Sequence, residues 1–174
     1  MLLSARFRSK LRINEASSIR FKVWITDIDV SIMNHAAIMT VMETGRLDFM
    51  VRTGFFKVAQ QSKWYFPSSG IHVQFFRPLK LFQRATLVTR AFHIDERWIY
   101  LEQRIIRNQK DIAFCIVKGT VKKGREQLNV LEVLKQLNIG KAPVTSTESL
   151  LPIDGAEKIM NQRLAEWNSE HSRN

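Results

Sequence analysis

The chain has 174 residues, the size of one ordinary domain, and this is enough to bury a hydrophobic core without disulfide crosslinks. Hydrophobic residues make up 45% and charged residues 25%, which is a globular composition and excludes wholesale disorder. The single cysteine, Cys115, excludes an internal disulfide and a cysteine-based zinc cluster.

The net charge is +11, from 27 Lys and Arg against 16 Asp and Glu, and it is unevenly distributed. Residues 1–22 carry +5 and residues 77–125 carry +8, whereas residues 23–76 are neutral and residues 126–174 carry −2. No block of five like charges occurs, so we expect no disordered tail that binds nucleic acid. We also find no uncharged apolar run near the ~20 residues of a membrane helix and no signal peptide, and we expect a cytoplasmic protein without integral membrane association.

The first predicted elements are a strand and a long helix. Residues 19–25 alternate apolar and polar side chains, which is typical of a half-buried strand. Residues 35–52 place apolar side chains at helical spacing over an unusually wide face, which predicts a largely buried helix. Asn34 is a suitable N-cap, and Gly54 stands where a left-handed residue would end the helix.

Four strand-like runs follow, over residues 71–76, 85–93, 98–107 and 112–122, and their short connections predict antiparallel hairpins. Residues 64–66 favour an additional short strand, and residues 130–137 and 154–170 favour two further helices. We expect a basic arm over residues 1–18, a main domain over 19–125 and a C-terminal helical extension over 126–174. One sheet buries one apolar helix by wrapping around it, so the sequence predicts an α+β fold; the wrapped-helix solution is the hotdog architecture, and the pattern alone leaves other α+β rolls open.

Five segments of the chain carry a family resemblance: VWITDID (23–29), MNH (33–35), METGRLD (42–48), FFRPL (75–79) and DERWIYLEQ (95–103). In this order, and over about residues 19–125, they resemble the hotdog acyl-CoA thioesterases of the 4-hydroxybenzoyl-CoA thioesterase type. The resemblance implies a hotdog fold and hydrolysis of an acyl-CoA to the free acid and coenzyme A, with no cofactor beyond the coenzyme A of the substrate. It also implies a homodimer or a dimer of dimers, because in this fold the pocket lies between two subunits.

The resemblance implies that Asp29, at the second position of the Asp-x-Asp motif, serves as base or nucleophile. After this position the family has three residues and then His-Met-Asn-Asn, whereas here Val30-Ser31-Ile32 is followed directly by Met33-Asn34-His35. This departure motivates an alternative function, a non-catalytic hotdog module that binds acyl-CoA or an acyl carrier. A third hypothesis places a membrane- or nucleic-acid-binding surface on the basic N-terminal arm.

Thioester hydrolysis needs a base or nucleophile near the carbonyl carbon and hydrogen-bond donors where the oxyanion develops. A helix N-terminus supplies such donors, so Asp29, just before the helix that begins near His35, is the first catalytic candidate; the alternative is a capping carboxylate. Asp27 fits hydrogen bonding to loop amides; the alternative is a carboxylate pair with Asp29, in which one pKa is raised and a general base is favoured. Asn34 and His35 are candidate donors to the thioester oxygen or helix caps. Glu43 is a candidate catalytic carboxylate, or it pairs with Arg46 or Arg77.

The remaining candidates concern the substrate. Surface cations can hold the phosphates of coenzyme A, and the candidates are Arg77, Lys80, Arg84, Lys118, Lys122 and Lys123; the alternative is a solvated charged face. Phe55, Phe56, Trp64 and Phe66 line an acyl tunnel or belong to an ordinary core, and their density favours a medium- or long-chain or aromatic acyl group. Cys115 has apolar neighbours and is expected to be a buried hydrophobe. No residues stand at metal-ligand spacing, so we expect no metal site.

Overall fold

The computed structural model describes residues 8–138, 142, 143, 153–160, 162 and 163. The chain forms two compact units, Met1–Val144 and Thr145–Asn174. In the second unit the described residues are helical and lie in and beside the helix expected over 154–170; the rest of that helix lies outside the described residues. The sheet and the long helix belong to the first unit. No described helix is long and apolar enough to cross a membrane.

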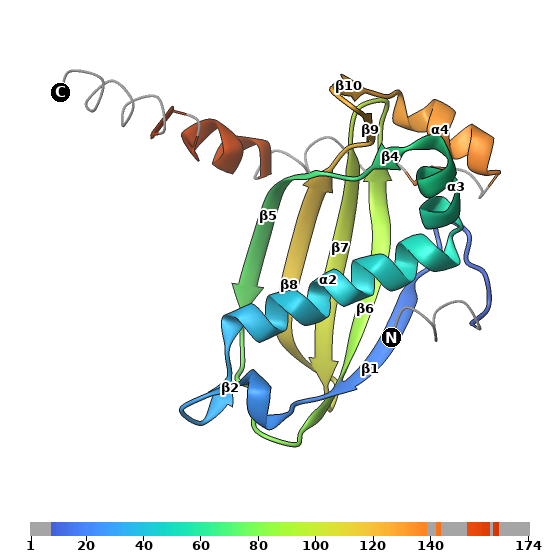
Figure 1. The fold of residues 1–174 in the computed structure, drawn as a ribbon. Coiled ribbons are helices and arrows are strands. Elements are labelled where there is room, and N and C mark those ends of the chain that lie inside the picture. The colour runs from blue at the N-terminus through green and yellow to red at the C-terminus, as the bar shows by residue number, and fades with distance from the viewer. Residues whose placement is uncertain (1–7, 139–141, 144–152, 161, 164–174) are drawn as a thin grey trace. The chain divides into compact units, whose positions relative to one another are not determined.

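An antiparallel sheet of five strands is the framework of the first unit (Figure 1). Its order is β1-β6-β7-β8-β5, so β1 and β5 are the two edge strands. The strands are β1 (Ser17–Lys22), β6 (Arg84–Ile94), β7 (Ile99–Arg107), β8 (Lys110–Gly119) and β5 (Ser68–Phe75), and each overlaps a run predicted from the sequence. The β7–β8 hairpin turns at Asn108 and Gln109, both at positive φ, which suits the twist of a tight hairpin.

The long helix α2 (His35–Arg52) lies across one face of this sheet, with the bounds that the apolar spacing predicts (Figure 1). This is the α+β hotdog arrangement. The inner face of α2 is buried, but Ala36, Thr40 and Glu43 on its outer face are exposed. Burial is therefore narrower than the wide apolar spacing predicts, because the sheet of one chain covers only one side of the helix.

A glycine lets α2 approach the sheet closely. A Cβ atom at Gly45 would lie 2.4 Å from Leu87 Cδ2 and 2.8 Å from Thr89 Oγ1, both on β6. Carbon atoms in contact lie about 3.5–4.0 Å apart, so no side chain fits at this position without displacement. Gly45 thus sets the separation between helix and sheet.

A second helix, α3 (Phe55–Ser62), follows α2 and is missed by the sequence pattern. Gly54 is left-handed as expected, with φ of 81°, but it begins α3, while Thr53 ends α2. Only Phe55 and Ala59 of α3 are buried. Eight residues with two inward positions are too few for a helical period to stand out in the sequence.

Parts of the predicted N-terminal arm and of the predicted C-terminal extension pack on the core of the first unit. The short strands β4 (Trp64–Tyr65), β9 (Lys122–Lys123) and β10 (Glu126–Gln127) form a small sheet, and the predicted helix α4 (Val130–Leu137) follows it. α4 buries Val130, Val133 and Leu134, and the segment before β1 buries Ile13. The compact units consequently divide at residue 144, whereas the sequence suggested divisions after residues 18 and 125.

Candidate functional site

The start of α2 is held by a short hairpin of β2 (Ile28–Asp29) and β3 (Ile32–Met33), which follows the 3-10 turn η1 (Ile25–Asp27). The Met33 N–H donates to the Leu79 carbonyl at 2.7 Å, and the Asn34 N–H donates to the Asp27 carbonyl at 2.8 Å. The first bond holds the residues just before the helix against the connection between β5 and β6, and the second holds them against the 3-10 turn.

Among the residues that the structure describes, two backbone donors at the helix start are left without an acceptor. The Asn34 side chain is the N-cap, as predicted, because its Oδ1 accepts from the Ala37 N–H at 2.7 Å. The Ile38 N–H donates to the Asn34 carbonyl at 3.1 Å. The N–H groups of His35 and Ala36 therefore have no acceptor inside the helix, and they lie at the positive end of its dipole. Both residues are exposed, and donors of this kind can stabilise an oxyanion.

The two aspartates before the helix differ in their partners. The Asp27 carboxylate accepts from the Trp24 N–H at 2.8 Å and closes the 3-10 turn, which is the loop hydrogen bonding expected for it. Asp29 is exposed on β2, opposite Ile32, and forms no ion pair within the part of the chain that the structure describes. Asp29 is the carboxylate of this hairpin that is available to a substrate.

An aromatic side chain from the sheet edge reaches the same place. The His35 ring packs on the Phe75 ring with 4.3 Å between centroids and 35° between planes. Phe75 is the last residue of the edge strand β5. The edge of the sheet therefore lies beside the helix start, a proximity that the sequence pattern does not indicate.

Glu43 is separated from the other candidates. It lies eight residues beyond His35, which is about 12 Å along the helix axis. Its carboxylate pairs with Arg46, one of the two partners expected, and its side chain is 56% exposed. The other expected partner, Arg77, instead donates to the Asp111 carbonyl at 2.8 Å. Within one chain, then, the structure gathers Asp29, Asn34 and His35, and Glu43 stands two turns away.

A buried polar network under α2 holds the partner of Glu43. Arg46 Nη1 donates to Gln103 Oε1 at 2.7 Å. Gln103 Nε2 in turn donates to the Met42 carbonyl at 2.7 Å and to Thr89 Oγ1 at 3.0 Å. A buried guanidinium requires such partners, and they fix its position. Sequence reasoning missed this network, although Gln103 between Leu101 and Ile105 is a polar residue in the inward phase of a strand.

The candidate phosphate-binding cations do not form one patch. Arg77, Lys80 and Arg84 lie at the end of the sheet where α2 begins, while Lys122 and Lys123 form β9 near the other end. Lys118 also lies there, because it is opposite Tyr100, about 30 Å along the sheet from Arg84. The expectation of a surface cation fails for Lys118: it is 6% exposed, and its ammonium lies 4.7 Å from the centre of the Trp98 ring.

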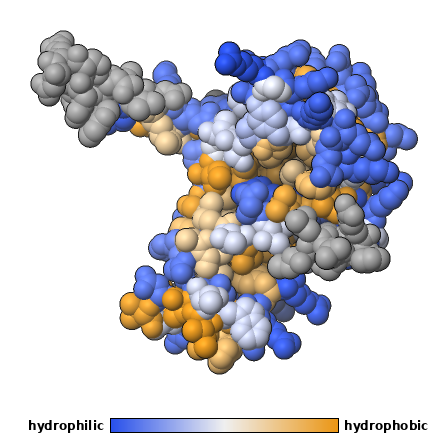
Figure 2. Space-filling view, viewed as in Figure 1, coloured by the Kyte–Doolittle hydropathy of each residue, from blue (hydrophilic) through white to orange (hydrophobic). Residues whose placement is uncertain are grey.

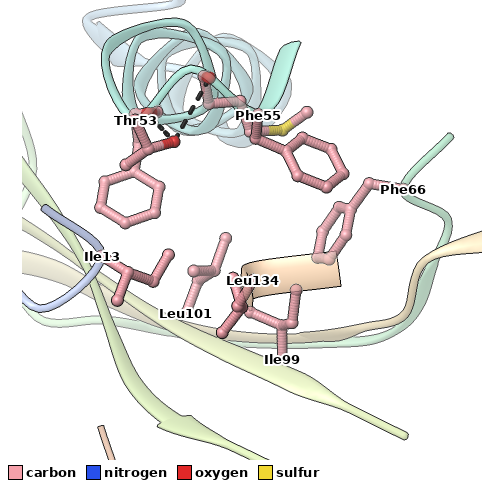
Figure 3. A pocket seen from close by; sticks show the side chains of 9 residues that line it. Ile13, Thr53, Phe55, Phe66, Ile99, Leu101 and Leu134 are labelled. Atoms are coloured by element: carbon pink, nitrogen blue, oxygen red, sulfur yellow. Dashed lines mark hydrogen bonds between the residues drawn. The ribbon is translucent and has the colours of Figure 1, made fainter. Parts of the chain in front are cut away.

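The aromatic residues after α2 enclose a small cavity near the C-terminal end of the helix (Figure 3). Phe55 and Phe66 meet edge to face on one side of it, with 6.5 Å between ring centroids, and Ile99, Leu101 and Leu134 line another side. Its volume is about 30 Å³, room for little more than a water molecule. It also begins about 20 Å along α2 from His35. In this chain Phe55 belongs to the core and Phe66 packs against it, and the cavity that they line is too small for an acyl chain.

Neither sulfur nor metal chemistry is indicated among the described residues. Cys115 is fully buried, and this burial raises the pKa of its thiol to about 11, while the charge of Arg46 acts in the opposite direction. The thiol is therefore protonated near neutral pH and is not a nucleophile. Among the residues the structure describes, no group of three or more His, Cys, Asp or Glu side chains is placed to hold a metal ion.

Comparisons with known proteins agree with this fold. The sequence profile of the thioesterase-like superfamily matches residues 23–137. Protein THEM6 of Drosophila melanogaster is 24% identical over 161 residues, 91% of this chain and 82% of that protein. A probable thioesterase from Bartonella henselae superposes with a TM-score of 0.61 at 20% identity, over 66% of this chain and 98% of that chain. Slr0204, a 1,4-dihydroxy-2-naphthoyl-CoA thioesterase from Synechocystis, superposes with a TM-score of 0.62 at 8% identity, over 71% of this chain and 95% of that chain. The structural likenesses establish the hotdog fold.

Proposed function

This chain belongs to the thioesterase-like superfamily, and we propose that it hydrolyses acyl-CoA thioesters to the free acid and coenzyme A. The observation that carries the proposal is the start of α2, where two free backbone donors and an available carboxylate lie on adjacent segments. A thioester has a good leaving group, so one carboxylate and two donors can suffice for hydrolysis.

The proposed reaction assigns each group at the helix start one task. The N–H groups of His35 and Ala36 donate to the carbonyl oxygen as it becomes an oxyanion; Ala37 is committed to the Asn34 cap. Asp29 takes a proton from water as the water oxygen attacks the carbonyl carbon. The C–S bond then breaks, and the coenzyme A thiolate receives the proton. In the alternative, nucleophilic mechanism Asp29 first attacks the carbonyl carbon and displaces the coenzyme A thiolate, and water then hydrolyses the resulting anhydride. The reaction draws on no cofactor.

Substrate binding is proposed from the side chains around this point. Arg77 and Lys80 flank Leu79, whose carbonyl accepts the hydrogen bond from Met33, so these two cations are the ones beside the helix start. They are proposed to hold phosphates of coenzyme A. Phe75 and Ile32 are exposed apolar residues near the same end and favour a medium- or long-chain or aromatic acyl group.

A second copy of the chain is proposed to complete the site, as a homodimer or a dimer of dimers. The edge strand β5 exposes Ile71 and Phe75 and is followed by the exposed Phe76. An edge strand with exposed apolar side chains invites pairing with another chain. Such pairing would also cover the outer face of α2, whose apolar residues Met39, Leu47 and Met50 are only half-buried in one chain.

The decisive experiment measures thiol release from a panel of acyl-CoAs. We expect turnover by the purified protein and a loss of about 100-fold or more in Asp29→Asn. Glu132→Gln, an exposed carboxylate on α4, is the matched control and keeps the full rate. Glu43→Gln separates the second candidate, because a larger loss there than in Asp29→Asn would assign the chemistry to Glu43.

Two outcomes would overturn the proposal. Full activity in Asp29→Asn would remove the carboxylate from the mechanism. Saturable binding of acyl-CoA without any turnover would instead assign a non-catalytic acyl-CoA-binding module, the function suggested by the altered residues after Asp29.

A further inference from the structure

A cluster of exposed apolar side chains at one end of the molecule takes no part in the proposed reaction. It consists of Trp24 and Ile25, after β1, and Leu81 and Phe82, before β6, which are 56%, 72%, 39% and 52% exposed. The Phe82 N–H donates to the Val23 carbonyl at 3.0 Å, so the two segments lie side by side. These four residues are called the apolar tip below.

The apolar tip is held in a defined geometry. The Trp24 and Phe82 rings meet edge to face with 6.3 Å between centroids, and the ammonium of Lys22 lies 4.6 Å from the centre of each ring. A cation close to two aromatic rings is a favourable arrangement. Figure 2 shows that hydrophobic residues gather at the lower end of the molecule, where Figure 1 places the loops around β2.

Positive charge surrounds the apolar tip. A groove of about 540 Å³ runs next to it and is lined by Arg20, Lys22, Trp24, Arg84 and Arg107, among others. With Lys80, five cations stand in residues 20–24, 80–84 and 106–108, and these segments contain no carboxylate; the acidic side chain next to the tip is Asp27, whose carboxylate accepts from the Trp24 N–H. The apolar side chains of the tip therefore lie beside a group of cations.

We propose that the apolar tip and the adjoining cationic groove dock on the surface of an anionic lipid bilayer. Trp24 and Phe82 would lie at the level of the headgroups, with Ile25 and Leu81 reaching the acyl boundary, while Arg20, Arg84 and Arg107 contact lipid phosphates. Docking would bring the hairpin that carries Asp29, at the same end of α2, next to the lipid surface.

Charge decides between a bilayer and a second copy of the chain. An interface in which two copies present the same patch would place five cations against five cations, which is repulsive. The edge proposed for self-association, β5, is also at the opposite side of the sheet from β1. Exposed Ile25 and Leu81 argue against single-stranded nucleic acid, because aliphatic side chains offer bases no stacking surface.

The location differs from the basic surface that the sequence suggested on the N-terminal arm. Arg8, in the described part of that arm, pairs with Asp48 of α2 at 2.9 Å and also donates to the Ser18 carbonyl. It is thus engaged within the fold. The cations of the tip come instead from β1, the β5–β6 connection, β6 and β7.

The test is sedimentation of the full chain with vesicles of phosphatidylcholine alone or with 30 mol% phosphatidylglycerol, a composition chosen for roughly physiological surface charge. We expect binding only to the anionic vesicles and weakening in 0.5 M salt, at which the Debye length falls to roughly 4 Å. Brominated lipids should quench the Trp fluorescence of the wild type. Most of this quenching should be lost in Trp24→Phe mixed with vesicles of the same composition.

Two double variants separate the apolar and the cationic parts. Trp24→Ala with Phe82→Asn should lower the partition coefficient at least about tenfold; Asn is chosen because Phe82 has φ of 62°. Arg20→Gln with Arg107→Gln should lower it roughly 25-fold, at about fivefold per cation. Lys57→Gln with Lys135→Gln, exposed residues on α3 and α4, removes the same charge and should leave binding unchanged.

Several results would overturn the inference. The first is no binding to anionic vesicles, and the second is equal binding by all three double variants. The third is a change of oligomeric mass in Trp24→Ala with Phe82→Asn. The fourth is displacement of the protein from vesicles by a single-stranded oligonucleotide that binds the same residues. None of these measurements uses acyl-CoA turnover, so a failure here and a failure of the proposed hydrolysis are distinguishable.

Discussion

Replacing Gly45 with alanine tests whether the separation of helix and sheet is set by this residue. In an exposed helix interior the change from Gly to Ala stabilises by up to about 1 kcal/mol through helix propensity. Here the new Cβ would lie 2.4 Å from Leu87 Cδ2 and 2.8 Å from Thr89 Oγ1. Relieving the first contact requires a shift of about 1 Å in a core whose carbons pack at 3.5–4.0 Å.

The expected outcome of Gly45→Ala is net destabilisation. Overpacking a well-packed core costs about 1–3 kcal/mol, which exceeds the gain in helix propensity. We expect the free energy of unfolding to fall by about 1–2 kcal/mol, and the urea midpoint to fall by roughly 0.5–1 M at a slope of about 2 kcal/mol/M. Circular dichroism at 222 nm against urea measures both quantities.

The matched control is Gly155→Ala, because a Cβ at this helical glycine would meet no atom within 4 Å. It should leave the midpoint unchanged or raise it. If Gly45→Ala were as stable as the wild type or more stable, the close approach of α2 to the sheet would not be a constraint, and the reasoning would be refuted.

Three further predictions follow from other contacts. Burial raises the Cys115 pKa to about 11, so the unfolded chain loses this thiol proton first as pH rises above about 9, and the free energy of unfolding should fall between pH 9 and 11. Cys115→Ala should remove this pH dependence, and iodoacetamide should leave Cys115 of the native protein unmodified at pH 8. Asp48→Asn removes the carboxylate shared by Arg8, Arg52 and Ser17, so it should lower the free energy of unfolding by about 3 kcal/mol and speed proteolysis before β1. Unchanged cleavage would show that Asp48 does not hold this segment in place. Ile71→Arg on the edge strand should shift the mass measured by light scattering to that of the monomer, while Lys57→Gln should not.

The fold was predictable because most of its elements are long enough to show a period. The helix over residues 35–52 and its Asn34 cap follow from local spacing and capping chemistry, and the four long strands follow from alternation and short connections. α3 was missed because its eight residues contain only two inward positions. The outer segments were set apart as an arm and an extension, because the sequence does not reveal that Ile13 and Val130 reach the same core.

The candidate site was predictable only in part. Asp29, Asn34 and His35 are close in the sequence, so their proximity at the helix start follows from the chain itself. Glu43 and Lys118 depend on the helical rise and on strand register, and both proved distant from Asp29, Asn34 and His35. The contact of His35 with Phe75 joins residues forty positions apart and carries no local signal.

The excess of 11 positive charges was fixed by the sequence, but its meaning was not. The sequence determined that most of this charge lies on the strands after residue 77, because composition and alternation are local properties of the chain. Only the tertiary structure decided which cations share a surface: it buried Lys118 against Trp98, paired Arg104 with Asp111, and brought Arg20, Arg84 and Arg107 around one groove beside an exposed tryptophan. The physical reason is that strand pairing joins distant segments, and the distance between two charges is set by that pairing.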